Sequence, residues 1–434
     1  MRIEESINNL RTKVEGVNNA ASAAWDAFKG GTGMIPKEEQ TIGNLKYAIR
    51  MNQEEMEPNE INFVDFNGLV LSMTIEEVMQ LTEMPKPNEY YNLTFEKWSE
   101  TLEEIQDGRC HTVGAFYHTT DGCNYYVVEV EAGQLVEMAQ IYAGAIYHWG
   151  DGISTSAQTN YSHTYEKAGR YIIKLENPAS NIGFYEAGDS KDAAPFMVEV
   201  YMSDKYKIFS PQTFKNSTKL RKISLPSTLT SGKIDNDSFP FVPNLKSLVL
   251  PDAVTFDDVS WSGTSNLYVE YLVANGQGMF SLPHCTNLKC FSCKNVTTSE
   301  VMLGYAIMPR LKNIVFDKIE TIISGVIPRG ADYRDPYTSG GIIDLPETLQ
   351  SIGNNSLRTC PAHVYLRTLT PPTLGGTSVF WWNDYNKKVT IHIRKDATYT
   401  DANGDTWTGL EAYAKATNWA TLYASSNFTF IDDL

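Results

Sequence analysis

The sequence predicts a multidomain, mainly β protein in which an N-terminal α-helical coiled coil precedes a β-sandwich and a C-terminal repeat solenoid with a cap. Three observations indicate this order. Apolar residues near the N-terminus recur at alternating steps of four and three, short strand-like runs between turns fill the middle, and one apolar motif repeats after residue 210. These periods are typical of a helix seam, of strands and of stacked coils. The 434 residues leave room for several domains.

An N-terminal stalk for oligomerisation and attachment is expected over residues 1–58. The alternating steps place eight apolar side chains at the two core positions of a heptad repeat: Ile3, Ile7, Leu10, Val14, Val17, Ala21, Ala24 and Phe28. This pattern favours self-association, and Ile or Val at both positions favours a homotrimer over a dimer. The alternative is an amphipathic helix that packs on its own domain.

A small α+β module is expected over residues 59–120. Alternating apolar residues on both sides of Asn67-Gly68 predict a β-hairpin. The segment Thr74–Glu77 has the Thr-x-x-Glu form of a capping box and predicts the start of a helix. A second helix is expected to contain Trp98, Leu102 and Ile105 and to end near Gly108.

A β-sandwich is expected over residues 121–200. Asp121-Gly122 lies between two strand-like runs and predicts another hairpin. Trp149 precedes a Gly-Asp-Gly turn, and His163-Thr164-Tyr165 follows. These motifs resemble the PKD family of immunoglobulin-like sandwiches. In such a fold Trp149 is expected to be a core ring and Asp151 to accept backbone N–H bonds within its turn.

A degenerate repeat occupies the second half of the chain. Copies of the pattern Leu-x-x-Ile-x-Leu begin at Leu220, Leu245, Leu288 and Leu311, with weaker copies around Ile343 and Val364 and a break around Leu267. Successive copies are 23 to 25 residues apart where the pattern is clear. This period is typical of a leucine-rich-repeat solenoid, in which each coil adds one short strand. We assign residues 201–375 to the solenoid and 376–434 to its cap.

The residues that flank these strands indicate which class of leucine-rich repeat the chain resembles. The segments Leu225–Leu229 and Leu345–Gly353 both begin with Leu-Pro, and Cys285–Leu288 has the form Cys-x-x-Leu. These motifs resemble the BspA-type leucine-rich repeats found in surface proteins and phages of gut bacteria. Leu410–Trp419 is similar to the C-terminal cap of that family. The resemblance implies an adhesion-type module that works by recognition.

Two possible metal sites have simpler interpretations. Cys290 and Cys293, with His284 and Cys285 nearby, have the spacing of a zinc site, but Cys293 falls at a repeated apolar position, so we favour ladder packing. The segment Asp401–Asp405 imitates a calcium loop but lacks the distal Glu, and its Asn-Gly pair predicts a hairpin turn. We therefore expect no metal or other cofactor.

Charge and motif content disfavour several classes of function. Lys and Arg number 36 against 52 Asp and Glu, which gives a net charge of -16. Such an acidic surface repels phosphate, so neither nucleic acid nor a membrane is an expected partner. Residues 1–6 do not resemble a signal peptide. We find no nucleophile elbow or phosphate loop, and His148 and His163 lack a neighbouring nucleophile, so we expect structural histidines and no enzyme activity.

These parts together suggest a tailed-phage virion appendage, a head or tail fibre made in the host cytosol and displayed outside the particle. Its expected partners are itself, other virion proteins through the N-terminus, and a glycan or protein of the host surface. Ile61–Trp98 also looks like a module found in phage structural proteins. The alternatives are a bacterial cell-surface adhesin of BspA type and, least favoured, a glycan-processing enzyme.

Three aromatic residues are the candidate ligand-binding residues. Trp381, Trp382 and Tyr385 lie in an insertion after Phe380 and offer stacking faces for a sugar or a protein. The alternative, which we favour, is that they cover the open end of the solenoid. Residues 328–340 are a second candidate segment.

Overall fold

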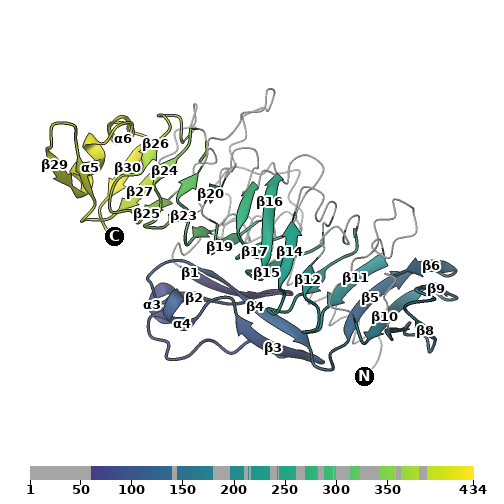
Figure 1. The fold of residues 1–434 in the computed structure, drawn as a ribbon. Helices are drawn as coiled ribbons and strands as arrows, with labels where there is room; N and C mark the ends of the chain where they lie inside the picture. Colours follow the sequence, from purple (N-terminus) through teal and green to yellow (C-terminus); the bar gives the residue numbers. More distant parts are fainter. Residues whose placement is uncertain are drawn as a thin grey trace, which may run out of the picture. The chain divides into compact units, whose positions relative to one another are not determined.

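The computed structural model describes residues 60–138, 144–178, 196–209, 214, 217–234, 242, 244–260, 269–281, 288–296, 298–299, 313–322, 342–354, 356–357, 363–380 and 389–434. The chain divides into two units, Met1–Met56 and Glu57–Leu434, and all described residues belong to the second. The eight heptad residues lie outside the described residues, and so do Trp381, Trp382 and Tyr385. The described part is mainly β, as predicted (Figure 1).

The first sheet has the order β2-β1-β4-β3. Its strands are β1 (Glu60–Asp65), β2 (Gly68–Thr74), β3 (Leu93–Trp98) and β4 (Thr112–Thr119). β1 and β2 pair antiparallel about Asn67-Gly68, which confirms the predicted hairpin. Residues 60–119, which comprise this sheet and the two short helices between its strands, are called the N-terminal module.

Both helices of the N-terminal module begin at capping boxes. They are α3 (Ile75–Val78) and α4 (Leu102–Ile105). Thr74 and Glu77 cap α3 as predicted, and Thr101 and Glu104 cap α4 in the same way. Trp98 lies outside α4, contrary to the prediction, because it ends β3 and pairs there with Ala115 of β4.

The predicted hairpin at Asp121-Gly122 is wrong. The chain does turn there, but β4 and β5 (Asn124–Val130) belong to different sheets. β4 is already paired on both edges, with β1 and β3. β5 is likewise flanked by β10 (Gly169–Glu176) and β11 (Met197–Tyr201). The local turn signal was therefore correct, but tertiary pairing decided the partners.

A six-stranded sheet has the order β13-β11-β5-β10-β7-β8, beside the pair β6-β9. The remaining strands of the sheet are β7 (Ile146–His148), β8 (Ser154–Ser156) and β13 (Lys222–Ser224). The pair consists of β6 (Gln134–Glu137) and β9 (Ser162–Tyr165). Trp149 is fully buried, as predicted, and its indole N–H donates to Thr155 Oγ1 at 2.8 Å. Asp151 accepts the backbone N–H of Ile153, as predicted. Gly150 has a φ of 86°, and a Cβ there would lie 2.7 Å from the Ile172 carbonyl oxygen, so glycine is required.

β11 joins the antiparallel strands to the repeats. On one edge it pairs antiparallel with β5, and on the other it pairs parallel with β13. The predicted boundary between the sandwich (121–200) and the solenoid (201–375) falls inside this strand. The six-stranded sheet is therefore continuous from its antiparallel strands to β13, with no open sheet edge between them.

An eight-stranded parallel sheet forms the main wall of the repeat region, in the order β15-β17-β19-β21-β23-β25-β27-β30. Its strands are β15 (Ser247–Leu250), β17 (Tyr271–Ala274), β19 (Cys290–Cys293), β21 (Asn313–Phe316), β23 (Ile342–Leu345), β25 (His363–Leu366), β27 (Val389–Ile393) and β30 (Phe428–Ile431). Phe291, Ile343 and Val364, all from the predicted copies, occupy equivalent positions in the register. β17 fills the place where the motif is broken, and Leu272 supplies its core side chain.

Two further parallel sheets have four short strands each, in the orders β12-β14-β16-β18 and β20-β22-β24-β26. In sequence, most of these strands alternate with strands of the eight-stranded sheet. Their strands are β12 (Ile208–Phe209), β14 (Ser231–Ile234), β16 (Val254–Ser260), β18 (Gly278–Ser281), β20 (Thr298–Ser299), β22 (Thr321–Ile322), β24 (Ser351–Ile352) and β26 (Thr373–Leu374). One apolar core runs from Tyr126 in β5 to Phe428 in β30.

The C-terminal segment extends the repeat sheet and also adds helices. β27 and β30 are further strands of the parallel wall, and α5 (Gly409–Lys415) and α6 (Trp419–Tyr423) lie between them in sequence. β28 (Thr398–Thr400) and β29 (Thr406–Thr408) form a hairpin. The carboxylate of Asp401 accepts the backbone N–H groups of Asn403 and Asp405 across its turn, which confirms the predicted turn.

Candidate functional site

Side chains alternate between the two faces of the eight-stranded sheet. One face joins the apolar core, and the opposite face is called the outer face. The outer-face residues of successive strands are Ser247, Val249, Tyr271, Val273, Cys290, Ser292, Val315, Ile342, Asp344, His363, Tyr365, Thr390 and His392. This face is mainly apolar at β15 and β17 and becomes polar and aromatic from β23 to β27.

The N-terminal module covers the apolar part of the outer face. One buried cluster joins the two sheets and contains Val64, Phe116, Val249, Tyr271, Val273 and Cys290. Gly114 of β4 permits this approach, because a Cβ at that position would lie 2.4 Å from a methyl carbon of Val249. Cys110 continues the contact against Val315 and Ile342. The covered region therefore reaches from β15 to β23.

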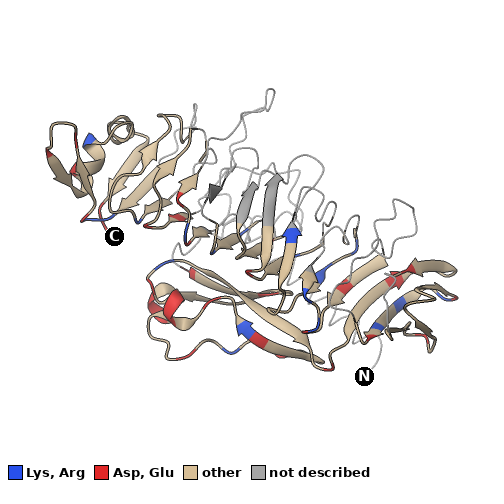
Figure 2. Ribbon diagram, in the orientation of Figure 1, with Lys and Arg blue, Asp and Glu red and all other residues tan. Residues whose placement is uncertain are grey.

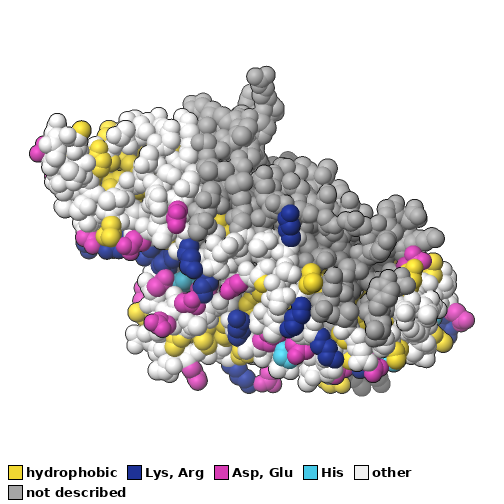
Figure 3. Space-filling view, in the orientation of Figure 1, with side chains coloured by type: hydrophobic (Ala, Val, Ile, Leu, Met, Phe, Trp, Pro, Cys, Tyr) yellow, Lys and Arg dark blue, Asp and Glu magenta, His cyan; other side chains and the backbone are white. Residues whose placement is uncertain are grey.

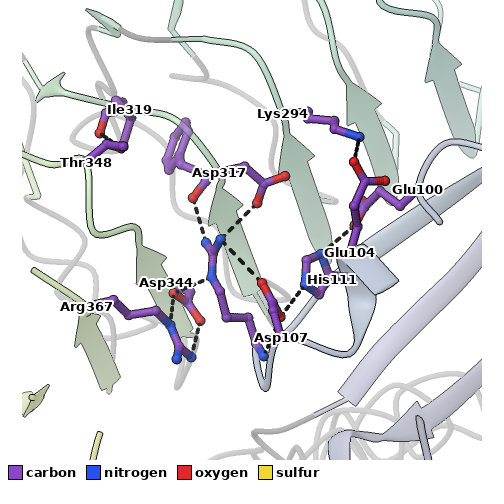
Figure 4. A network of polar contacts seen from close by, with 12 residues as sticks. Glu100, Glu104, Asp107, His111, Lys294, Asp317, Ile319, Asp344, Thr348 and Arg367 are labelled. Atoms are coloured by element: carbon purple, nitrogen blue, oxygen red, sulfur yellow. Dashed lines mark hydrogen bonds and ion pairs between the residues drawn. The ribbon is translucent and has the colours of Figure 1, made fainter. Parts of the chain in front are cut away.

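Arg109 connects the N-terminal module to a polar network beyond this apolar contact (Figure 4). Its Nε donates to Asp344 Oδ1 at 3.2 Å, its Nη1 to Asp317 Oδ1 at 3.0 Å and its Nη2 to the Phe316 carbonyl at 2.6 Å. Burial by itself would lower the pKa of Arg109, but the charges of Asp344 and Asp317 raise it. Arg109 therefore remains a cation, bound to groups at the ends of β21 and β23.

Two guanidinium groups share the buried carboxylate of Asp344. Arg367 donates from Nε to Asp344 Oδ1 and from Nη2 to Oδ2, both at 2.8 Å. Burial raises the pKa of the neighbouring Asp317 to about 6, the charge of Glu100 adds to this, and Arg109 opposes it. The two arginines and two aspartates thus balance one another in charge.

His111 lies between two carboxylates of its own module. Its Nε2 is 2.9 Å from Asp107 Oδ1, and its Nδ1 is 2.6 Å from Glu100 Oε2, an ion-pair contact without hydrogen-bond geometry. Burial would lower the pKa of His111, but Glu100 and Asp107 raise it to about 10. His111 is therefore doubly protonated at neutral pH.

The acidic helix α4 supplies a second ionic link to the repeat sheet. Figure 2 shows the acidic residues of the short helices in red, and Figure 4 shows Lys294 reaching Glu104. Lys294 follows β19 and its Nζ pairs with Glu104 Oε1. Glu104 also closes the capping box of α4, so one carboxylate both starts the helix and attaches it to the sheet.

The outer face beyond β23 carries a stacked polar row. The rings of Tyr365 and His392 stack with centroids 4.2 Å apart and an interplanar angle of 4°. His392 Nδ1 lies 2.9 Å from the Asp433 carboxylate, and His392 Nε2 lies 2.9 Å from His363 Nδ1. Burial lowers the pKa of His363, the nearby His392 lowers it further, and Asp433 opposes this. His363 and Tyr365 are half-buried, whereas His392 is buried between its partners.

An open pocket of about 540 Å³ lies beside this row and is lined by four cations, Arg109, Arg367, Arg394 and Lys395. Carboxylates of Asp107, Asp317, Glu347 and Asp396 lie among them. Figure 3 shows basic and acidic side chains interspersed on the face in view. Such a lining offers both donors and acceptors to a polar ligand.

The positions of Cys290 and Cys293 favour packing over metal binding. Cys290 faces the N-terminal module, whereas Cys293 faces the main core, so the two thiols lie on opposite sides of the sheet. Burial raises the pKa of Cys293 to about 12, which disfavours the thiolate that a metal needs. Within the described ranges, no three His, Cys, Asp or Glu side chains converge as a metal site. His284 and Cys285 lie outside those ranges.

No sequence pattern identified Arg109, Asp344 or Arg367 as a site residue. One available signal was Asp344 in Ile342–Leu345, a carboxylate inside an otherwise apolar strand of the repeat. Such a residue needs a buried partner. Its partner Arg109 is 235 residues away in sequence, so no spacing rule connects the two.

The comparisons with known proteins address the repeats. Among the curated proteins compared, none matches this chain. The helices in the described part are all too short or too polar to cross a membrane. Residues 196–268 match the family model described as "BspA type Leucine rich repeat region (6 copies)". The matched segment begins one residue before β11, the strand whose parallel pairing with β13 links the six-stranded sheet to the repeats. The chain therefore contains a BspA-type leucine-rich repeat region.

Proposed function

We propose that the protein is a non-enzymatic, surface-displayed binding protein that attaches to a glycan or protein of a host. The observation that supports this best is the polar end of the outer face, where Tyr365 stacks on the buried His392 and an open pocket is lined by residues that follow β25 and β27. Ordered rings and charged groups on a rigid sheet are suited to recognition. The BspA-type repeats suggest the same adhesin-like role.

We further infer that this surface belongs to a tailed-phage virion, as a head or tail fibre that oligomerises through its N-terminal heptads. The support comes from the sequence, which places a heptad seam before PKD-like motifs and BspA-type repeats. The fibre would contact other virion proteins through residues 1–58 and the host through its repeat region. A bacterial cell-surface adhesin of BspA type is the second candidate, and the family match over residues 196–268 favours it.

Immunogold labelling distinguishes these two locations. Antibodies against the purified chain, applied to the source culture and to its lysate, are expected to decorate the exterior of phage particles. Gold confined to the bacterial envelope would instead establish the adhesin.

A cell-binding assay tests the shared role. Fluorescently labelled full-length protein is expected to bind host cells saturably, with competition from unlabelled protein. Absence of saturable binding to any host strain of the phage would contradict attachment. Glycan hydrolysis that a single carboxylate substitution abolishes would contradict the non-enzymatic role.

A further inference from the structure

The open pocket is built from three separate parts of the chain. Arg109 comes from the N-terminal module, Arg367 follows β25, and Arg394–Asp396 follow β27. Binding sites commonly form where such parts meet. Arg109 and Arg367 are both held by Asp344, so two walls of the pocket are fixed before any ligand arrives.

The cations of the pocket differ in how strongly carboxylates of the protein already bind them. Arg109 and Arg367 are both bound to the buried carboxylate of Asp344. Arg394 pairs with Asp396 and with Glu347, whose side chains are 61% and 59% exposed, and such exposed pairs contribute little. Lys395 is exposed and forms no ion pair with any carboxylate in the described part of the chain. Arg394 and Lys395 are therefore the groups that an incoming anion can engage at low cost.

The carboxylates beside these cations restrict the kind of anion. Asp317 and Glu347 line the same pocket and accept hydrogen bonds but repel further negative charge. A phosphodiester chain brings repeated charge and few donors, so it fits poorly. A sugar with one carboxylate and several hydroxyl groups satisfies both kinds of group. The hydroxyls of such a sugar would donate to Asp317 and Glu347, and its carboxylate would accept from Arg394 and Lys395.

We propose that this pocket binds an acidic sugar, of the sialic or uronic acid class, through its carboxylate. The proposal rests on the proposed function and identifies the glycan chemistry that the attachment surface would recognise. The half-buried Tyr365 ring, which stacks on His392, lies on the adjoining outer face and would border the rest of the glycan.

Titration calorimetry at low salt on the full-length chain tests the proposal. The probes are the methyl glycosides of N-acetylneuraminic acid and D-glucuronic acid, with methyl glucoside as the neutral comparison. At least one acidic glycoside is expected to bind, the neutral glycoside is not, and added salt is expected to weaken binding. Lys395→Gln is expected to lower the affinity about five-fold, as for the loss of one exposed charge contact.

Lys167→Gln is the matched control, because Lys167 is an exposed lysine in the turn between β9 and β10. It is expected to leave the affinity unchanged. Failure of both acidic glycosides to bind at millimolar concentration, equal binding of the neutral glycoside, or binding that Lys395→Gln does not alter would each overturn the proposal. If the protein still binds host cells in those cases, only the acidic-sugar inference fails. Loss of cell binding as well would remove the proposed function too.

Discussion

Two residues of the N-terminal module make its contact with the repeat sheet specific. Gly114 allows β4 to approach Val249, and Arg109 places a buried cation between Asp317 and Asp344. The first contact depends on the absence of a side chain, and the second on a complete set of hydrogen bonds. Each therefore predicts a different response to substitution.

Gly114→Ala is expected to destabilise the protein by about 1–3 kcal/mol, because the new methyl group overlaps a Val249 methyl group at 2.4 Å. Urea denaturation measures the loss. Adding Val249→Ala removes the overlapping methyl group, so the double variant is expected to lose less than the sum of the two single variants. Strict additivity would show that the two residues do not meet.

Arg109→Met is expected to cost about 3–5 kcal/mol, because Asp344 and Asp317 lose a shared buried partner. Arg394→Met is the control, since Arg394 pairs with the exposed Asp396, and its cost is expected to stay below about 1 kcal/mol. Chemical denaturation of both variants provides the comparison. Equal costs would contradict the structural role given to Arg109.

At the scale of elements, α4 and the loop after it form the ionic part of the contact. Glu104 reaches Lys294, Arg109 reaches β21 and β23, and His111 neutralises Glu100 and Asp107 within the module. A four-residue helix has little stability of its own. Its capping box and these contacts therefore hold it in place together.

The His111 charge predicts a pH dependence of stability. Glu100 and Asp107 raise the pKa of His111 to about 10 in the folded protein, above its ordinary value of 6.5. The resulting stabilisation is complete below about pH 6.5 and is lost as the pH rises towards 10. The free energy of unfolding is therefore expected to fall between pH 7 and pH 10.

His111→Gln is the control for this effect, because tyrosines and lysines also titrate near pH 10. The variant is expected to be less stable at pH 7 and to show a flatter profile. Denaturation at a series of pH values gives both curves. Parallel curves for the two proteins would contradict a protonated His111.

For the whole molecule, the heptad seam predicts self-association through residues 1–58. Ile7→Asp with Val14→Asp is expected to convert the assembly to a monomer, because two charges per chain would enter the seam. Sedimentation equilibrium of the full-length protein measures the mass. An unchanged mass would refute the seam and favour a helix that packs on its own domain.

Local patterns predicted much of the fold. The capping box at Thr74, the hairpin at Asn67-Gly68 and the burial of Trp149 were all readable, because each depends on residues close in sequence. The repeat pattern likewise predicted the core positions of β19, β23 and β25. It missed β17, where Leu272 fits the core but the surrounding motif is absent.

What the sequence determined by itself is the order of the elements and the repeat architecture, since hydrophobic period and turn residues act over a few residues. The tertiary structure alone decided which strands pair with β4 and β5, and that the N-terminal module covers the outer face. It also created the pocket lined by Arg109 and Arg367. The physical reason is that these contacts join residues from tens to more than 200 positions apart, where burial and charge select the partner and no local period records it.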